Sequence, residues 1–493
     1  MAKHTAFINL GIVALDPDAP VPLYQQLYER LRDAILAGQL AAGMRLPPTR
    51  FFANELGVSR NTVVSAFDQL TAEGYIESKV GAGSYVASNL PEDILELRGH
   101  TPETQTPHRW NRSGILSKRG ELVAASPVRR EASLPVPFQP GLPAVDEFPF
   151  KVWERLVAHH WRYLPMSNFG YGDAVGYRPL REAIAAYLGA ARGVRCDADQ
   201  IIVVAGTQQA ISLAAQILLD PGDKVWMEDP GYVDARMALL GVGVEPVPVP
   251  VDAEGLSLRA GQKAAPDARL VYITPSYQYP LGIRMSLRRR LRLLEWANRH
   301  NAWILEDDYD SEYRYAGRPL APLQGLDQAG RVIYIGTFSK VLLPSLRLGY
   351  MVAPHDLVDA FAAALTLAIR CLPIIPQAVL TDFFSEGHFA RHVRRMRTLY
   401  AERQALLVEQ VRQHLAGRLD ISPGDAGLHL IAWLNGMADR EASTRLAAAG
   451  LKVPPLAEYA VQPQSRAGLL LGYAPLTEEQ IRTGVEKMAR ALV

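Results

Sequence analysis

Short apolar runs recur through the last two thirds of this 493-residue chain, and they limit the fold to a few possibilities. Each run is about as long as a buried strand, and helical patterns separate several of them. Strands that alternate with helices form a mostly parallel sheet with helices on both faces. We therefore predict an α/β domain with strands at residues 201–204, 224–227, 244–249, 270–273, 303–306 and 332–335. Amphipathic helices to about residue 415 and a small α+β segment complete it.

Polar residues follow two of these runs. Asp307 and Tyr309 come directly after 303–306, and Lys340 follows 332–335 together with Thr337 and Ser339. Open α/β sheets bind ligands at the carboxyl ends of their strands. A lysine there is a candidate for a Schiff base, a buried carboxylate would keep a pyridinium nitrogen protonated, and a phenol would tune the imine. A Ser-Lys pair alone is a weak signal because most lysines lie on the surface, and these neighbours strengthen it.

A phosphate site is predicted in the same region. Gly206, Thr207 and Gln208 lie between the run 201–204 and a helical pattern, so their amides begin a helix. The first amides of a helix have no intrahelical acceptor and bind anions well. Arg347 would add a charge-assisted contact to the same phosphate.

Residues 135–493 resemble the class I/II aminotransferases, which are fold-type I pyridoxal-phosphate enzymes. The resemblance rests on a set of motifs at 171–181, 206–208, 228–232, 307–309, 339–340 and Arg466. It implies that Lys340 carries pyridoxal 5′-phosphate as a Schiff base, that Asp307 pairs with the pyridine nitrogen and that Tyr309 approaches O3′. It also implies that Tyr232 stacks on the ring and that Tyr171 contacts phosphate across a homodimer interface.

An effector subsite follows from the same resemblance, in which Arg466 would clamp a ligand carboxylate. Arg236, four residues after Tyr232, would reach the same acid group, although surface ion pairing is an equally open interpretation. One motif departs from the family, because residues 279–282 read Tyr-Pro-Leu-Gly where Asn-Pro-Thr-Gly is usual. The missing asparagine counts against ordinary transaminase chemistry.

A separate unit is predicted at residues 21–87. Apolar residues at helical spacing after Pro22, a short helix ending before Gly57 and a third helix capped by Ser59 give the outline of a helix-turn-helix. The pattern from Tyr75 to Val86 predicts a two-stranded hairpin, or wing. The unit resembles the winged helix-turn-helix of the GntR regulators.

The N-terminal end of the third helix is the part that meets base edges in the major groove. We expect base contacts from Ser59, Arg60, Asn61 and Thr62, phosphate contacts from Arg50 and Lys79, and a close approach of the wing backbone at Gly81 and Gly83. The alternative is that the polar residues only cap the helix and that Arg50 is solvated. Acidic and basic residues balance in this unit, so DNA binding would require positive charge gathered on one face.

Residues 88–134 lose these patterns and contain repeated X-Pro pairs, which predicts an interdomain linker. The net charge of +1 and the two distant cysteines, Cys196 and Cys371, indicate neither a membrane nor a metal or disulfide site. The start of the chain lacks a signal core, and prolines and Arg370 interrupt the most apolar segment. We expect a cytoplasmic protein.

A GntR-type unit joined to an aminotransferase-like domain is the architecture of the MocR/GabR subfamily, which this chain resembles from end to end. The resemblance implies a pyridoxal-phosphate-dependent transcription regulator that binds operator DNA as a homodimer and has little or no turnover. Its effector would be an amine, an amino acid or pyridoxal phosphate itself. The alternatives are an active aminotransferase that carries a DNA-binding unit, and a DNA-binding protein whose large domain only dimerises.

Overall fold

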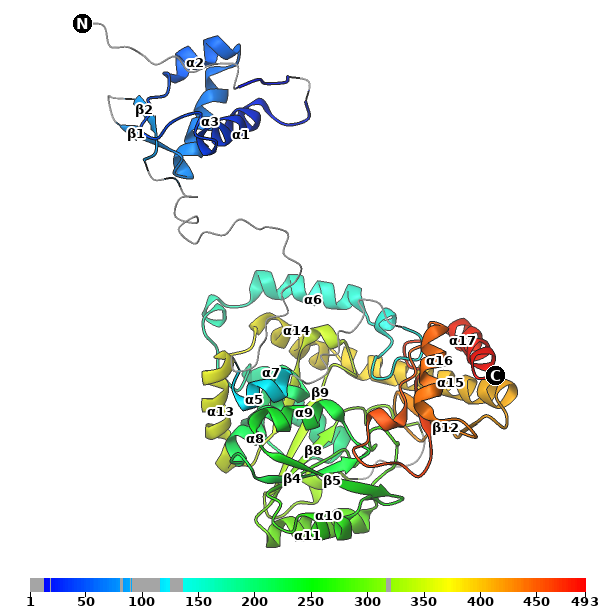
Figure 1. Cartoon of the computed structure of the whole chain (residues 1–493). Coiled ribbons are helices and arrows are strands. Elements are labelled where there is room, and N and C mark those ends of the chain that lie inside the picture. The colour runs from blue at the N-terminus through cyan, green and yellow to red at the C-terminus, as the bar shows by residue number, and fades with distance from the viewer. Residues whose placement is uncertain are drawn as a thin grey trace, which may run out of the picture. The chain divides into compact units, whose positions relative to one another are not determined.

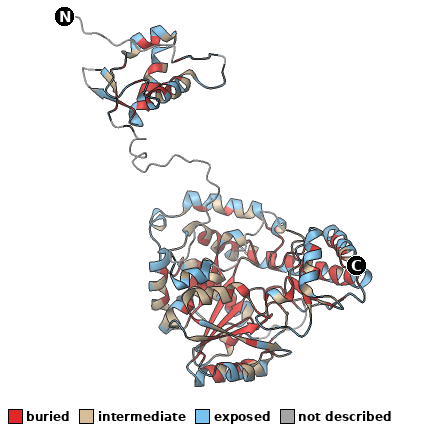
Figure 2. Cartoon of the chain, in the orientation of Figure 1, coloured by how far each residue is buried: buried red, intermediate tan, exposed pale blue. Residues whose placement is uncertain are grey.

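The chain divides into two compact units, residues 1–111 and 112–493. The computed structural model in Figure 1 describes residues 13–17, 19–79, 83–88, 90, 116–124, 136–315 and 321–493. Each unit has its own buried interior (Figure 2). No helix in these ranges combines the length and apolarity that crossing a membrane requires.

The first unit is the predicted winged helix-turn-helix. Its elements are α1 (Leu23–Leu36), α2 (Thr49–Leu56), α3 (Arg60–Ala72), β1 (Ile76–Lys79) and β2 (Gly83–Val86). Gly57 ends α2 in the left-handed region, with a φ of 65°, so the chain can turn sharply into α3. Leu31, Phe52, Val63 and Leu70 are buried between the helices. Strands β1 and β2 pair antiparallel, as expected for a wing.

The second unit is built on one eight-stranded sheet with the order β3-β10-β9-β8-β7-β4-β5-β6. All six predicted strands are present, and they run parallel to one another. Two short strands were not predicted: β10, which pairs antiparallel with both β3 and β9, and β6, which pairs antiparallel with β5. The bounds are β3 Ile201–Val204, β4 Lys224–Asp229, β5 Glu245–Asp252, β6 Gly255–Leu256, β7 Leu270–Ile273, β8 Trp303–Asp308, β9 Val332–Thr337 and β10 Gly349–Val352.

Helices cover both faces of this sheet (Figure 1). One apolar core lies between the sheet and α8 (Thr207–Leu218), α9 (Val233–Val242) and α13 (His355–Ile369). A larger core includes α7 (Arg178–Arg192), α14 (Ile374–Ser385) and α15 (His388–His414), and α6 (Phe150–Tyr163) packs on α14. The α10 (Leu258–Ala264) and α11 (Leu287–Arg299) helices bury a third core around Trp226 and Trp296.

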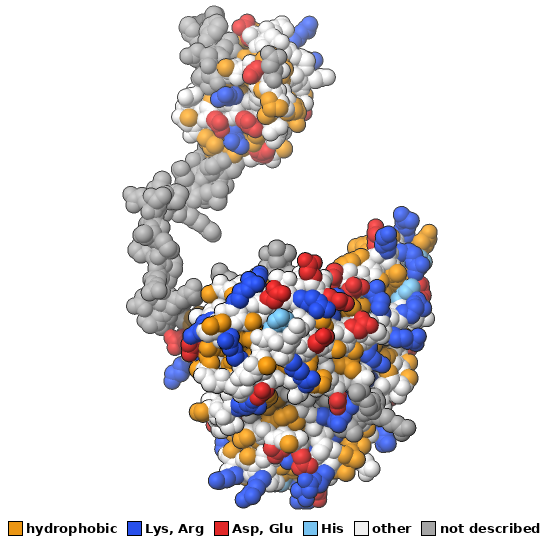
Figure 3. All heavy atoms as spheres, turned by 90° about the vertical axis from the view of Figure 1, so that its right-hand side faces the viewer, with side chains coloured by type: hydrophobic (Ala, Val, Ile, Leu, Met, Phe, Trp, Pro, Cys, Tyr) orange, Lys and Arg blue, Asp and Glu red, His pale blue; other side chains and the backbone are white. Residues whose placement is uncertain are grey.

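A smaller antiparallel sheet forms the C-terminal part of this unit. Its order is β11-β12-β13, and two helices accompany it. The bounds are β11 Leu419–Ile421, β12 His429–Leu434, α16 Asp439–Ala448, β13 Gly468–Gly472 and α17 Glu478–Ala491. Acidic and basic side chains intermix over the face that Figure 3 presents, in keeping with the small net charge of +1.

Part of the predicted linker is a helix. Residues Lys118–Ala124 form α5, which contacts α9, and the side chain of Val123 lies beside Gly241. None of its residues is buried, so the apolar periodicity that reveals a core helix is missing from its sequence. Most of the remaining residues of 88–134 lie outside the described ranges.

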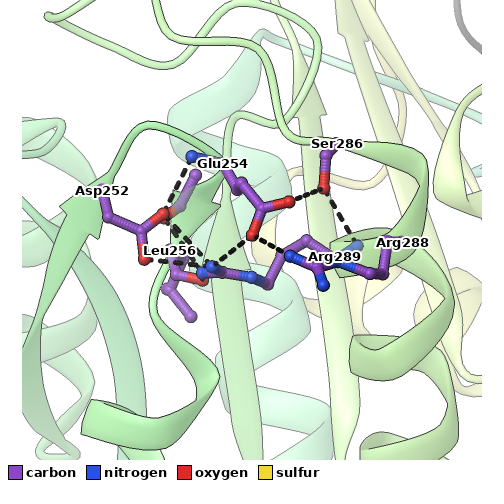
Figure 4. Close-up of polar contacts among 7 residues, drawn as sticks. Asp252, Glu254, Leu256, Ser286, Arg288 and Arg289 are labelled. Atoms are coloured by element: carbon purple, nitrogen blue, oxygen red, sulfur yellow. Dashed lines mark hydrogen bonds and ion pairs between the residues drawn. The ribbon is translucent and has the colours of Figure 1, made fainter.

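A polar network fixes the start of α11 against the turn between β5 and β6 (Figure 4). Ser286 caps the helix by accepting from the amide of Arg289 at 3.2 Å, and its hydroxyl donates to Glu254. The Arg289 guanidinium donates to the carbonyl of Leu256 at 2.5 Å and to both carboxylates of the turn. Because its side chain is only 13% exposed, these bonds are partly shielded from water.

We predict that Arg289→Ala destabilises the unit by about 1–3 kcal/mol, because buried backbone acceptors lose a charged donor. The neighbouring Arg288→Ala is the matched control, since Arg288 is 66% exposed and its one polar partner among the described residues is Glu254. Urea unfolding of both variants measures the difference. Equal stability of the two variants would contradict this account of the network.

Candidate cofactor and effector site

A cavity of about 150 Å³ lies at the carboxyl ends of the parallel strands. The large sheet, the start of α8 and the C-terminal part of the unit all contribute to its wall. The lining residues are Gly141, Gly206, Thr207, Gln208, Tyr232, Tyr272, Thr274, Tyr279, Asp307, Tyr309, Thr337, Ser339, Lys340, Arg347, Leu428 and His429. With the exception of Tyr171, every residue predicted to bind the cofactor is among them.

Lys340 lies just beyond the end of β9, and its Nζ donates to the carbonyl of Gly141 at 2.6 Å. A side chain at position 141 would place its Cβ only 3.2 Å from this nitrogen. Gly141 also has a φ of 83°, which few other residues adopt. The backbone amide of the neighbouring Ser339 donates to the Thr337 hydroxyl at 3.2 Å, and this bond fixes the backbone before the lysine. The lysine head is therefore presented to the cavity by a glycine that leaves it room.

Asp307 and Tyr309 place two unsatisfied polar atoms in this cavity. Asp307 is 3% exposed, and its Oδ2 accepts from the Tyr272 hydroxyl at 2.6 Å. Among the described residues, neither Asp307 Oδ1 nor the Tyr309 hydroxyl has a hydrogen-bond partner. Burial raises the pKa of Asp307 to about 7, because the loss of hydration outweighs the hydrogen bond from Tyr272 that favours the charged form. A protonated ring nitrogen of a ligand would give Asp307 Oδ1 a donor, and a ring oxygen would give the Tyr309 hydroxyl an acceptor.

The other end of the cavity has the features of a phosphate site. Gly206 precedes α8 with a φ of 117°, and its amide neighbours Thr207 and Gln208 form the first turn of that helix. A Cβ on Gly206 would lie 3.7 Å from the guanidinium of Arg347, so the cation faces this turn. Amides of a first helical turn and a guanidinium together suit a phosphate dianion. The residues present thus fit pyridoxal 5′-phosphate at both ends.

Aromatic rings surround the middle of the cavity. Tyr279, which replaces the usual asparagine, has its ring centroid 5.7 Å from Tyr232, 5.8 Å from Tyr309, 5.2 Å from His429 and 5.4 Å from Tyr459. Burial lowers the pKa of His429 to about 4, so this ring is neutral. The departure from the family motif therefore exchanges an amide for part of an aromatic wall.

Several lining residues were not predicted from the sequence. Tyr272 lies inside an apolar run, and Gly141 and His429 come from segments far from the motifs. Tyr272 lies near Asp307 because β7 is the neighbour of β8 and ends at the same edge of the sheet, a strand order that the local sequence does not reveal. Gly141 and His429 carried no local signal either.

The structure does not bring Arg466 to the cavity. Its guanidinium pairs with Asp420 and lies 5.3 Å above the ring of Trp433. Strands β12 and β13 pair Trp433 with Gly468 at one end and His429 with Gly472 at the other. Only the His429 end reaches the cavity, so the expected carboxylate clamp at Arg466 is not formed.

Arg236 and Tyr171 also lie outside the cavity wall. Arg236 lines a separate space of about 10 Å³ on which Tyr232, Glu228 and Tyr459 also border. Tyr171 is 82% exposed, and the guanidinium of Arg370 lies 4.6 Å from its ring centroid. Tyr171 therefore does not line the cavity of its own chain.

Four of the predicted DNA-contacting residues, Ser59 to Thr62, lie at the start of α3. Ser59 caps this helix, because its hydroxyl accepts from the amide of Thr62 at 3.1 Å. The capping role that the alternative interpretation gave to the polar residues is therefore observed for Ser59. Arg60 and Asn61 are exposed beside it, and Arg50 is exposed on α2. Gly83 has a φ of 103°, and a Cβ there would lie 3.2 Å from Arg45. Gly81 and the side chain of Lys79 lie outside the described part.

A winged helix-turn-helix with a separate fold-type I cofactor site defines a class, the pyridoxal-phosphate-binding transcription regulators. Comparison with known proteins supports this. Residues 23–86 match the family described as bacterial regulatory proteins, gntR family, and residues 147–488 match aminotransferase class I and II.

Relatives share both parts. The chain is 45% identical over 98% of its length to the probable rhizopine catabolism regulatory protein MocR of Rhizobium meliloti, covering 96% of that protein. It is 30% identical to the pyridoxine biosynthesis transcriptional regulator PdxR of Corynebacterium glutamicum, covering 97% of this chain and 98% of that protein.

Among solved structures, an α-aminoadipate aminotransferase of Thermus thermophilus complexed with N-(5′-phosphopyridoxyl)-L-leucine has a TM-score of 0.70 at 27% identity. It covers 77% of this chain and 97% of the other. The chain belongs to the aminotransferase class I and II family and is a MocR-type regulator of the gntR family, with pyridoxal 5′-phosphate as its cofactor.

We predict that Asp307→Asn stabilises the cofactor-free protein at pH 8 by ~2–4 kcal/mol. Between the ordinary carboxyl pKa and about 7, the folded chain binds more protons here than the unfolded chain, so stability falls as pH rises through this window. The gain from asparagine should therefore be full at pH 8 and nearly absent at pH 4.

Thermal unfolding at both pH values, with and without pyridoxal phosphate, checks this prediction. Added cofactor should reverse the order of the two proteins at pH 8, because asparagine cannot hold the proton of the ring nitrogen. A gain that is independent of pH would show that the Asp307 carboxylate is not the cause.

Proposed function

We propose that Lys340 binds pyridoxal phosphate covalently and that ligand binding at this cavity controls operator binding by the winged helix. The observation that carries the proposal is that Lys340, Asp307 and Arg347 line one cavity in which the second oxygen of Asp307 has no partner among the described residues. Uncompensated buried carboxylates are costly and mark functional sites more often than structural ones.

Each residue has a distinct role in this proposal. The amides of Thr207 and Gln208 and the guanidinium of Arg347 hold the phosphate, and Asp307 holds the proton of the ring nitrogen. Tyr309 donates to the ring oxygen, and Tyr232 packs on the ring. When bound, the cofactor supplies an electrophilic carbon that exchanges the lysine amine for another amine. Residues 428 and 429 close the cavity from the C-terminal part.

The effector is proposed to be an amine without a distal acid group, or pyridoxal phosphate itself. Lys340 and Arg347 are the two cationic side chains that line the described cavity, and both are assigned to the cofactor. No guanidinium there is left to hold a carboxylate. The rings of Tyr279 and His429 offer apolar and π contacts instead. The name of the PdxR relative, which refers to pyridoxine biosynthesis, supports the second choice.

A homodimer is proposed from an exposed apolar surface on the second unit. Trp161 and Met166 are 62% and 83% exposed, and Tyr171 and Leu367 are 82% and 89% exposed. Trp161 stacks on Phe169, and the guanidinium of Arg370 lies over the ring of Tyr171. Apolar surfaces of this kind are typical of protein interfaces. In the dimer, Tyr171 would reach the phosphate end of the second copy's cavity.

Lys340→Ala tests the proposed function. We expect the variant to keep its fold but to lose the visible absorbance of the bound cofactor and any cofactor- or amine-dependent change in DNA affinity. Binding to DNA from upstream of its own gene should be measured at fixed salt concentration, with and without pyridoxal phosphate. A variant that still responds to the ligand would overturn the proposal, and steady turnover of an amino donor by the wild type would favour an active aminotransferase.

Tyr171→Phe tests the shared site. We expect pyridoxal phosphate affinity to fall about tenfold, because one donor to the phosphate is lost. Light scattering should still report a dimer for this variant. A monomeric wild-type protein at micromolar concentration, or unchanged affinity in the variant, would contradict the proposal that Tyr171 contacts the phosphate bound by the second copy.

A further inference from the structure

A second and larger space lies away from the cofactor cavity. It is a groove of about 680 Å³ between α7, the end of α14 and the start of α15. Part of its wall is apolar, with the ring of Tyr187 5.7 Å from Phe384 and 5.1 Å from Phe389. The charged residues of its lining are Arg192, Glu312, Arg314, Arg394 and Arg397. Several alanines of α7, Ala186 among them, leave the groove open. A space of this size accommodates a small organic molecule.

The inner end of the groove adjoins a small recess of about 20 Å³. Arg192, Ser311 and Arg314 line both spaces, so the two are neighbours. Arg284 and Arg290 complete the cationic wall of the recess, and no carboxylate belongs to its described lining. Four arginines thus border a space that holds one water molecule or one small polar head, although the Arg290 guanidinium already donates to three backbone carbonyls.

The carboxylates that balance these arginines lie outside the recess. Asp308 pairs with Arg192 at 2.6 Å, whereas Asp425 lies 3.6 Å from Arg284 and 3.7 Å from Arg314. The last two separations are too long for hydrogen bonds. Burial is the main cause of the lowered pKa of Arg314, and the positive charge of Arg284 lowers it further. An anion in the recess would offset the repulsion between these two guanidinium groups.

We propose that the recess and groove bind an organic monocarboxylate, with its acid group among the arginines and its apolar body over Phe384 and Phe389. A carboxylate matches the planar fork of a guanidinium, and its two oxygens suit a recess of this size. Arg284 is the principal contact, because it is 41% exposed and its one described partner, Asp425, is beyond hydrogen-bond distance.

The proposed site lies behind the cofactor cavity, on the opposite side of the same strand. Successive residues of β8 point to opposite faces of the sheet. Asp307 lines the cofactor cavity, whereas Asp308 bonds to Arg192, a residue of the recess. A bound acid that pairs with Arg192 would therefore compete with Asp308 for this arginine. Asp308 is the neighbour of Asp307 in β8, so the competition would affect the cofactor side of the strand. The site thus offers a second chemical input to the regulator.

Isothermal titration calorimetry of the full-length protein tests the proposal, with benzoate as probe and acetate, phosphate and chloride as comparisons at constant ionic strength. We expect saturable benzoate binding and at least tenfold weaker binding of acetate, which has no body for the groove. Arg284→Gln should weaken benzoate binding about tenfold, and Arg288→Gln, an exposed arginine on the nearby α11, should not. Ala186→Phe, which fills the groove from an exposed helix position, should also abolish binding.

Lys340→Ala separates this site from the cofactor cavity. Unchanged benzoate binding in this variant supports the proposal, whereas its loss would place the acid beside the cofactor and overturn it. Tighter binding of phosphate than of benzoate, equal binding by the Arg284→Gln and Arg288→Gln variants, or no saturable binding to the wild type would each overturn it as well.

Discussion

The buried carboxylate of Asp307 is the constraint on which the site depends. It lies at the end of β8, between the parallel strands β7 and β9, so the sheet holds its backbone in place. The Tyr272 hydroxyl satisfies one oxygen, and the other has no partner in the described chain. Protein interiors tolerate such a charge only at a cost in stability. A cofactor with a protonated ring nitrogen removes that cost, so binding free energy and folding free energy are coupled at this residue.

The other acids of β8 show what a structural solution looks like. Asp308 accepts from Arg192 at 2.6 Å and from the Tyr334 hydroxyl, and these contacts lower its pKa despite complete burial. Glu306 accepts from the amides of Leu323 and Gln324 at 2.9 and 3.0 Å. On the side away from the cavity, Asp308 therefore has an ion pair and Glu306 has two backbone donors, although Asp308 Oδ1 has no partner among the described residues and burial raises the pKa of Glu306 to about 7. Asp307 differs from both because it faces a cavity with room for a cationic ligand.

The sequence could predict those parts of the fold and site that depend on local order. Apolar runs located six parallel strands, and the residues after them located Asp307 and Lys340, because strand ends share one edge of the sheet. Tyr272 and His429 escaped prediction, since only the strand order and the C-terminal sheet bring them near. Arg466 was misplaced for the same reason: the antiparallel register of β12 and β13 puts it at the end away from the cavity. Local patterns carry no information on such long-range register.

The cavity wall comes from two parts of the second unit, and this limits how a ligand can act. The Tyr277 hydroxyl donates to the carbonyl of His429 at 3.0 Å, and the His429 ring lies 3.1 Å from the carbonyl of Pro280. A ligand that contacts both Tyr279 and His429 therefore changes the free energy of packing between the large sheet and the C-terminal part. The winged helix has its own core and need not refold. The change in DNA affinity can then be no larger than the ligand's preference for one arrangement of the chain over another, with each tenfold effect requiring about 1.4 kcal/mol.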